Sequence, residues 1–385
     1  MLTTYQDIVA HLTSYMRDNN ANNARPFAKR AVADALREMA NIHRWNYYRT
    51  VGRLSTSASY STGTVSYTHT GGTYERQLTL SDGTFPLWIA DGCVIIDTVP
   101  YDVSERKSDT VVTLSALSNP GTDVASGTSY TAYRDTYPTP VDFVDIERVL
   151  VLDRDTELCY VSPSDWLSYQ RYYSQPTNVW YYTIMGDPNY QGSMSFRLAG
   201  APSSAETIDF IYRRRPRPLR YYEYNTGTVS VTADSATVTG SGGTVFSEFM
   251  VGSVIRFYDS TNYPTNEDGD YPAYVERTII NVSSTTVLTV DAVVPDTYTN
   301  VKYVISDPID IDKQSMLNAF KRTAEKLIEQ NRQGKNLASV VEMWRQDIRM
   351  AIGADKRYAG VAVAGQGQPP YSSGNLGDDA IVEFG

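Results

Sequence analysis

Apolar side chains recur at helical spacing near both ends of the chain. Thr4 and Asp7 have the spacing of a capping box, which predicts the start of a first short helix. Pro26 predicts the first turn of a second helix, and Gly334 predicts the end of a third, before a fourth begins. The apolar positions of the four helices are Ile8, Val9, Leu12, Tyr15 and Met16; Phe27, Ala31, Ala35, Met39 and Ile42; Met316, Leu317, Phe320, Ala324, Leu327 and Ile328; and Leu337, Val340, Val341, Trp344, Ile348 and Ile352.

Between these helices the pattern changes to alternating apolar and polar residues, rich in Thr, Ser, Gly and Val. This alternation predicts strands joined by turns. Two such stretches repeat each other, which predicts a duplicated β module. The matching segments are 63–68 with 227–232, 83–85 with 243–245, 92–95 with 252–255, and 110–114 with 286–290, and Tyr130 with Tyr133 matches Tyr303.

A third sequence pattern lies between the two repeats, where hydrophobic segments alternate with short polar ones. It predicts a small mixed sheet with one short helix that begins near Trp166. The predicted strands are 147–152, 158–161, 179–185, 193–198 and 207–212.

Together these patterns predict an α+β fold. The helices of both ends are expected to pack with the small central sheet as one discontinuous core, and the two all-β modules are expected to be insertions into it. Few large apolar residues follow Gly353, which predicts an extended C-terminal tail. The expected parts are the N-terminal helices (1–50), the first β module (51–140), the central sheet (141–220), the second β module (221–308), the C-terminal helices (309–352) and the tail (353–385).

Composition narrows the classes of protein. Of the 385 residues 41% are hydrophobic and 20% charged, values typical of a globular chain. The formal net charge of −10 argues against a surface that coats nucleic acid or an anionic membrane, although DNA can still pass through an acidic channel. Two cysteines, no apolar run of ~20 residues and no signal peptide pattern predict a reduced, soluble, non-exported protein without a membrane partner.

Residues with catalytic or metal-binding potential are scarce. The three histidines, His11, His43 and His69, do not have metal-ligand spacing. His11 and His43 lie on predicted helix faces beside apolar residues and are expected to be capped or packed. The acidic groups at 153–157 and 266–270 are expected to be solvated, with a weaker alternative of Ca²⁺ binding in the second. We therefore predict a protein that is not an enzyme and has no catalytic residue, metal site or cofactor.

One basic stretch stands out on this acidic chain. Pro216 and Pro218 predict that it is extended. Its arginines could contact phosphate or a neighbouring subunit, or they could pair within the protein. The candidate residues are Arg213, Arg214, Arg215, Arg217 and Arg220.

The order of these features resembles that of the head-to-tail adaptor (connector) proteins of tailed bacteriophages. Two N-terminal helices precede the strand segment 142–149, the helix start 161–166, and the strands 180–184 and 208–214, and two long helices with a loose tail follow. The resemblance covers about half of the chain. The two β modules are a departure from it, because compact adaptors lack insertions of this size.

The resemblance implies a structural virion protein, located at the head–tail neck and assembled in the host cytoplasm. It implies a ring of identical subunits, usually twelve, that joins the portal protein to tail or neck proteins while double-stranded DNA passes without sequence specificity. It also implies that the C-terminal arm contacts the portal. The candidate residues are Gly353, Tyr358, Val361, Val363, Pro369, Pro370, Tyr371, Leu376, Ile381 and Phe384.

Two other functions remain open from the residues alone. The 30 tyrosines and the duplicated β modules also suit a phage tail protein that binds a receptor or carbohydrate. A secreted glycoside hydrolase is a more distant alternative. It needs a catalytic carboxylate pair and an export signal, and the sequence pattern identifies neither.

Overall fold

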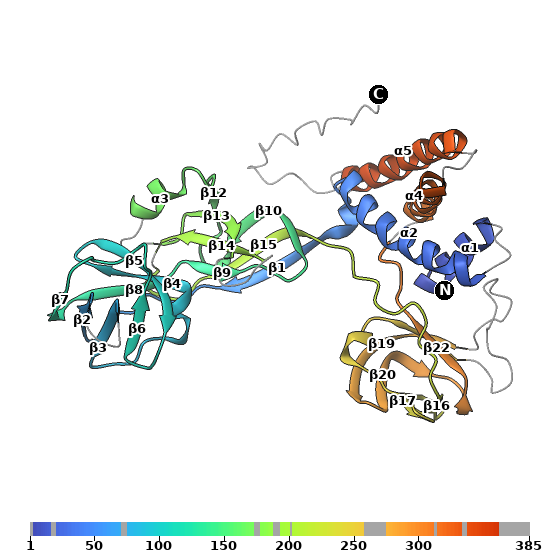
Figure 1. Cartoon of the computed structure of the whole chain (residues 1–385), viewed down its shortest axis with the longest axis horizontal. Coiled ribbons are helices and arrows are strands. Elements are labelled where there is room, and N and C mark those ends of the chain that lie inside the picture. Colours follow the sequence, from blue (N-terminus) through green and yellow to red (C-terminus); the bar gives the residue numbers. More distant parts are fainter. Residues whose placement is uncertain are drawn as a thin grey trace. The chain divides into compact units, whose positions relative to one another are not determined.

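The computed structural model describes residues 3–16, 21–70, 75–172, 178–187, 193–200, 202–257, 275–311, 314–332 and 337–361. In this part of the chain there are 22 strands and five α-helices, so the protein is mostly β (Figure 1). It divides into two compact units. Unit 1 comprises Met1–Tyr48 and Pro216–Gly385, and unit 2 comprises Arg49–Arg215.

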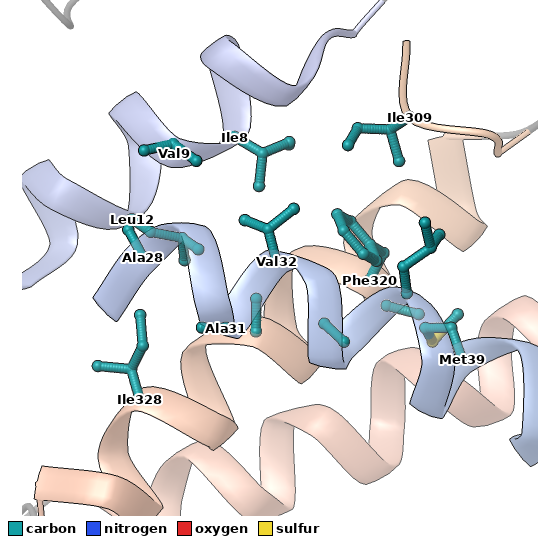
Figure 2. Close-up of a cluster of buried hydrophobic side chains, with 14 of the residues drawn as sticks. Ile8, Val9, Leu12, Ala28, Ala31, Val32, Met39, Ile309, Phe320 and Ile328 are labelled. Atoms are coloured by element: carbon teal, nitrogen blue, oxygen red, sulfur yellow. The ribbon is translucent and has the colours of Figure 1, made fainter. Parts of the chain in front are cut away.

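Unit 1 contains a helical bundle formed by both ends of the chain. Its core combines Ile8 and Leu12 with Phe320 and Ile328, and the small side chain of Ala31 lets the helices approach closely (Figure 2). None of the described helices combines the length and apolar character of a membrane span. The helices are α1 (Tyr5–Met16), α2 (Ala21–Ile42), α4 (Gln314–Arg332) and α5 (Leu337–Val361), with a 3₁₀ turn η1 (Asn46–Tyr48) after α2.

The starts of the first two helices test two sequence predictions. The capping box of α1 is confirmed, because the Thr4 N–H donates to Asp7 Oδ2 at 2.9 Å and the Asp7 N–H donates to Thr4 Oγ1 at 3.4 Å. The prediction that Pro26 lies in the first turn of α2 is wrong, since the helix begins at Ala21. Ala24 is buried in the bundle core, and its burial favours the additional N-terminal turn.

The rest of unit 1 is a seven-stranded antiparallel β module, called module 2. The strand order is β21-β16-β17-β20-β19-β18-β22. Val301 of one edge strand and Tyr303 of the other belong to the same buried cluster, so the sheet curls around its own core. The strands are β16 (Thr228–Val231), β17 (Ser235–Ser241), β18 (Val254–Phe257), β19 (Val275–Ser284), β20 (Val287–Val294), β21 (Tyr298–Val301) and β22 (Tyr303–Ser306), with a 3₁₀ turn η4 (Glu248–Met250).

Unit 2 contains a second seven-stranded module, called module 1, with the equivalent strand order β7-β2-β3-β6-β5-β4-β8. Its separate core includes Phe85, which contacts Tyr130 edge to face, as Phe246 contacts Tyr303 in module 2. The strands are β2 (Thr64–Thr68), β3 (Gln77–Ser81), β4 (Gly92–Ile96), β5 (Val99–Arg106), β6 (Val111–Leu114), β7 (Val124–Thr128) and β8 (Tyr130–Arg134), with a 3₁₀ turn η2 (Leu87–Asp91).

The strand pairing shifts one of the predicted repeat matches by a residue. Val94 lies opposite Ala132, and Ile255 lies opposite Ile305. Ala132 and Ile305 form equivalent bridges, to Tyr60 and Tyr224. Val94 therefore corresponds to Ile255, and the sequence match of segment 92–95 with segment 252–255 is off by one position.

The remainder of unit 2 consists of two four-stranded sheets that share one core. Phe196 of one sheet lies 4.8 Å from Phe210 of the other, measured between ring centroids, and both are buried. All described pairings are antiparallel except that of β12 with β13. The sheets are β1 (Arg49–Ser55), β15 (Thr207–Arg214), β10 (Phe143–Val151) and β11 (Thr156–Glu157); and β12 (Cys159–Tyr160), β13 (Tyr181–Gly186), β14 (Met194–Ala199) and β9 (Thr136–Pro138), with α3 (Trp166–Tyr172) and a 3₁₀ turn η3 (Leu152–Arg154).

The predicted fold class is therefore wrong. The α+β core was expected to join the helices to the central sheet, but the buried cluster of the bundle contains no residue of 49–215. The strands of that region instead form two sheets that bury Phe143, Phe196 and Phe210 against one another, in the same unit as module 1. Because these aromatic side chains complete a core of their own, the sheets need no cover from the helices.

The expected boundary of the extended tail is also wrong. Helix α5 continues through Gly353 to Val361. Asp355, only 5% exposed, lies 3.1 Å from His43 Nε2 and accepts the N–H of Asn46 at the same distance. These contacts stabilise the last turns of α5 against η1, although Gly353 disfavours a helix locally. Residues 362–385 lie outside the described part of the chain.

Candidate functional site

Residues 216–221, called the connector, lead into unit 1 and hold two of the five candidate arginines. Pro216 and Pro218 prevent a helix, so the chain is extended here. The backbone N–H groups are instead bonded to aspartates: Arg217 N–H donates to Asp310 Oδ2 at 2.8 Å, and Tyr221 N–H donates to Asp307 Oδ2 at 2.7 Å. The connector is therefore fixed to unit 1 at both ends.

Asp307, the residue directly after β22, joins three parts of unit 1. It is fully buried, and its Oδ1 accepts bonds from Ser253 Oγ at 2.7 Å and from Arg217 Nη2 at 3.1 Å. Its carbonyl oxygen accepts the N–H of Tyr5 at 2.7 Å. Asp307 thus connects α1, module 2 and the connector, and it fixes the guanidinium of Arg217.

A pocket of about 460 Å³ lies beside the connector. Arg220 places its guanidinium carbon 4.7 Å from the ring centroid of Phe249, which is the distance of a cation–π contact. Phe249 comes from η4 and is 62% exposed. The pocket therefore offers a fixed cation, a second cation and a flat apolar surface. Its walls are Arg217, Pro218, Arg220, Glu248, Phe249 and Val251.

The position of Arg217 depends on a glycine. Gly252 has a φ of 81°, and a Cβ at this position would collide with Nη1 of Arg217. Any other residue would both strain the backbone and displace the guanidinium. The glycine after η4 therefore shapes one wall of the pocket.

The other three candidate arginines lie in unit 2. Arg213 pairs with Asp145 at 3.0 Å, and Arg214 lies on β15. The backbone N–H of Arg215 donates to the carbonyl of Asp142 at 2.6 Å, and its side chain is exposed. The structure thus places only Arg217 and Arg220 around one pocket, and it uses Arg213 within unit 2.

The candidate portal-binding residues divide into two groups. Gly353, Tyr358 and Val361 lie in the last turns of α5. Val363, Pro369, Pro370, Tyr371, Leu376, Ile381 and Phe384 lie outside the described residues.

A second cluster of ionisable groups lies in unit 2, around Cys93. The thiol is 3.2 Å from Asp102 Oδ1 and 3.7 Å from Asp135 Oδ2. Burial, followed by the charge of Asp135, raises the pKa of Cys93, and burial raises the pKa of Asp135 although Arg197 opposes this. A buried, protonated thiol is a poor nucleophile, so this arrangement suits a structural role.

The remaining histidines and cysteines give no sign of a catalytic or metal site in the described part of the chain. His11 lies 3.0 Å from Glu325, and His69 lies 3.2 Å from the Tyr67 hydroxyl. Neither Cys93 nor Cys159 forms a disulfide, and among the described residues no group of three or more His, Cys, Asp and Glu could hold a metal. The acidic loop 266–270 lies outside the described residues.

Sequence reasoning missed Phe249, Glu248 and Asp307. The short segment 248–251, which has three apolar residues between Ser247 and Gly252, could have suggested a turn. Nothing in the sequence indicated that Asp307 would be buried, because its partners are 54 to 90 residues away along the chain.

Comparison of the chain with known protein families finds no family that matches, and comparison with curated proteins finds no match either.

Proposed function

We propose that this chain is a structural protein of a tailed bacteriophage, a head-to-tail adaptor that assembles as a ring on the portal. In this proposal the ring lies in the neck of the virion and connects to tail or neck proteins, and double-stranded DNA passes through it. The protein has no catalytic role.

The observation that carries the proposal is the helical bundle made by the two ends of the chain. Helices α1 and α2 pack with α4 and α5, which is the order of helices on which the adaptor resemblance rests. Residues 362–385 continue directly from α5 and contain few large apolar side chains, a composition suited to binding along a partner. The central sheet does not support the proposal, because its strands belong to unit 2 and contribute no residue to the core of the helical bundle.

The two β modules give the chain two additional surfaces of the same architecture. Equivalent strand orders in modules 1 and 2 permit equivalent contacts with repeated partners, as the subunits of a ring or a tail would provide. Their 3₁₀ turns expose large apolar side chains, among them Leu87 (86% exposed) and Phe249. Such residues are typical of protein interfaces.

The proposal is tested with purified portal rings by cosedimentation and mass photometry. The full chain should bind the portal and form rings, and a chain that ends at Val361 should bind at least about tenfold more weakly, because it lacks the segment proposed to contact the portal. The cut is placed after Val361, so that Asp355 and its contacts remain. Absence of portal binding by the full chain would overturn the proposal.

A tail protein that binds carbohydrate is the second candidate. Tyr160 and Trp180 are 55% and 41% exposed in unit 2, and aromatic side chains of this kind form sugar-binding surfaces. Glycan binding by a full chain that ignores the portal would favour this candidate.

A further inference from the structure

The pocket beside the connector contains exposed side chains that a partner could contact. Phe249 and Val251 are 62% and 41% exposed. The guanidinium of Arg220 contacts the Phe249 ring, and no carboxylate in the described part of the chain pairs with it. The pocket therefore combines apolar surface with a cation that can still accept an acidic partner.

The side chain of Arg217, unlike that of Arg220, is held in place by hydrogen bonds within the described part of unit 1, so part of the pocket is preformed. Asp307 and Ser253 hold its Nη2 at 3.1 Å each, and Gly252 leaves room for its Nη1. A ligand would meet one prearranged wall and one adjustable side chain. Prearrangement lowers the entropic cost of binding.

The chain itself contains a segment whose chemistry fits this pocket. Residues 362–385 include three acidic side chains and no basic one. The acids Asp378, Asp379 and Glu383 are close in sequence to Ile381 and Phe384, so the same short segment offers carboxylates for Arg220 and apolar groups for Phe249 and Val251.

We infer that the pocket binds residues 378–384 of the same chain. Helix α5 belongs to the same unit as the pocket, so the segment is tethered close to it. The tether of residues 362–377 spans up to about 55 Å when extended, compared with a radius of gyration of about 17 Å for a unit of this size. A tether of this length gives an effective concentration of the order of 1 mM, so weak contacts are enough for occupancy.

The inference adds a form of regulation to the proposed function. A tail that occupies the pocket is withheld from other partners until a tighter contact displaces it. The docking itself depends only on groups of this chain, so it can be tested without any portal protein. Failure of the portal experiment and failure of this one are thus separate results.

The test uses a fluorescent peptide with the sequence of residues 376–385 and the chain that ends at Val361, which retains every described residue. Fluorescence anisotropy should show saturable binding, weakened at least about fivefold by Phe249→Ala or Arg220→Ala. Glu248 lines the pocket and repels the acidic peptide, so Glu248→Gln should tighten binding about twofold. The matched control is Arg215→Ala, an exposed arginine outside the pocket, which should change nothing.

The full chain distinguishes binding of its own segment from binding of another copy. Its pocket should already be occupied, so it should bind the added peptide at least about fivefold more weakly than the shortened chain. The variant D378N/D379N of the full chain should regain peptide binding, and this change leaves the folded units untouched. Three outcomes would overturn the inference. They are equal peptide binding by the full and shortened chains, self-association of the full chain through this segment, and peptide binding that Phe249→Ala leaves unchanged.

Discussion

Arg256 shows how one buried side chain can connect two different kinds of structure. It lies on β18, is 6% exposed, and donates to both carboxylate oxygens of Asp7 at 2.8 and 2.9 Å and to Glu276 at 3.0 Å. Asp7 belongs to the capping box of α1, so the guanidinium connects module 2 to the helical bundle within unit 1. Burial alone would raise the pKa of Asp7, but the hydrogen bonds from Arg256 outweigh it and lower the pKa.

The first prediction concerns this residue. Arg256→Met should destabilise unit 1 by about 2 kcal/mol, less than the ~3–5 kcal/mol of a fully buried pair because Asp7 is partly exposed. The matched control is Arg53→Met. Arg53 makes the same two-bond contact with Asp209, at 2.6 and 2.8 Å, but on an exposed surface of unit 2, so its loss should have little effect. Urea unfolding monitored by circular dichroism measures both changes.

The effect of Arg256→Met should also depend on pH. Because the folded-state pKa of Asp7 is lowered, its stabilising contribution is present above its ordinary value of 3.8 and is lost as the pH falls through the folded-state pKa. The difference between wild type and variant should therefore shrink below pH 4. A difference that stays constant down to pH 2 would contradict the role assigned to Asp7.

At the scale of the element, each β module depends on a tight turn in front of its first strand. Gly63 has a φ of 80° and Gly227 a φ of 82°, and in both a Cβ would collide with the backbone carbonyl oxygen of a serine, Ser81 or Ser241. The equivalent geometry explains why the repeat is clearest at these glycines.

The second prediction follows from this turn. Gly63→Ala should destabilise unit 2 by about 3 kcal/mol, because it adds a collision to the cost of a left-handed backbone. Gly127→Ala is the control, since Gly127 has a φ of 89° with no atom within 4 Å of the added Cβ. It should cost only about 1 kcal/mol. Thermal unfolding measures both variants, and equal losses would show that the collision is relieved without cost.

The elements differ in how far the sequence predicts them. The apolar stripe from Met316 to Ile328 is a local pattern, and it predicted α4 because helix bonds join residues four apart. The end of α5 was missed because its stabilising partners, His43 and Asn46, are about 310 residues away along the chain. The binding pocket was missed for the same reason, as only its two arginines stand out in the sequence.

The fold class was wrong for a related physical reason. The strands around Phe143, Phe196 and Phe210 were predicted, but the surface that covers them was not. A strand pattern shows which face is buried without showing what it is buried against. The choice between a helical cover and a second sheet depends on contacts between distant segments, which periodicity does not record.

At the scale of the whole molecule, the two units have separate cores. Unit 2 runs without interruption from Arg49 to Arg215 and contains module 1 and the paired sheets. A continuous segment with its own core has what it needs to fold alone.

The third prediction is that residues 49–215, produced by themselves, fold and unfold cooperatively. Calorimetry of the full chain should show two transitions, one of which matches the isolated unit in temperature. A segment without β structure by circular dichroism, or a single two-state transition of the full chain, would contradict the separation of the units.

The division of unit 1 into two segments also has a consequence during synthesis. The apolar face of α1 and α2, with Ile8, Leu12 and Val32, is completed by α4, which is translated about 290 residues after α2. At roughly 5–20 residues per second the ribosome needs about 15–60 s for this distance. Unit 2 is finished within that interval and can fold first. The apolar face of the nascent helices α1 and α2 stays uncovered meanwhile, which makes this early part of the chain prone to aggregation during translation.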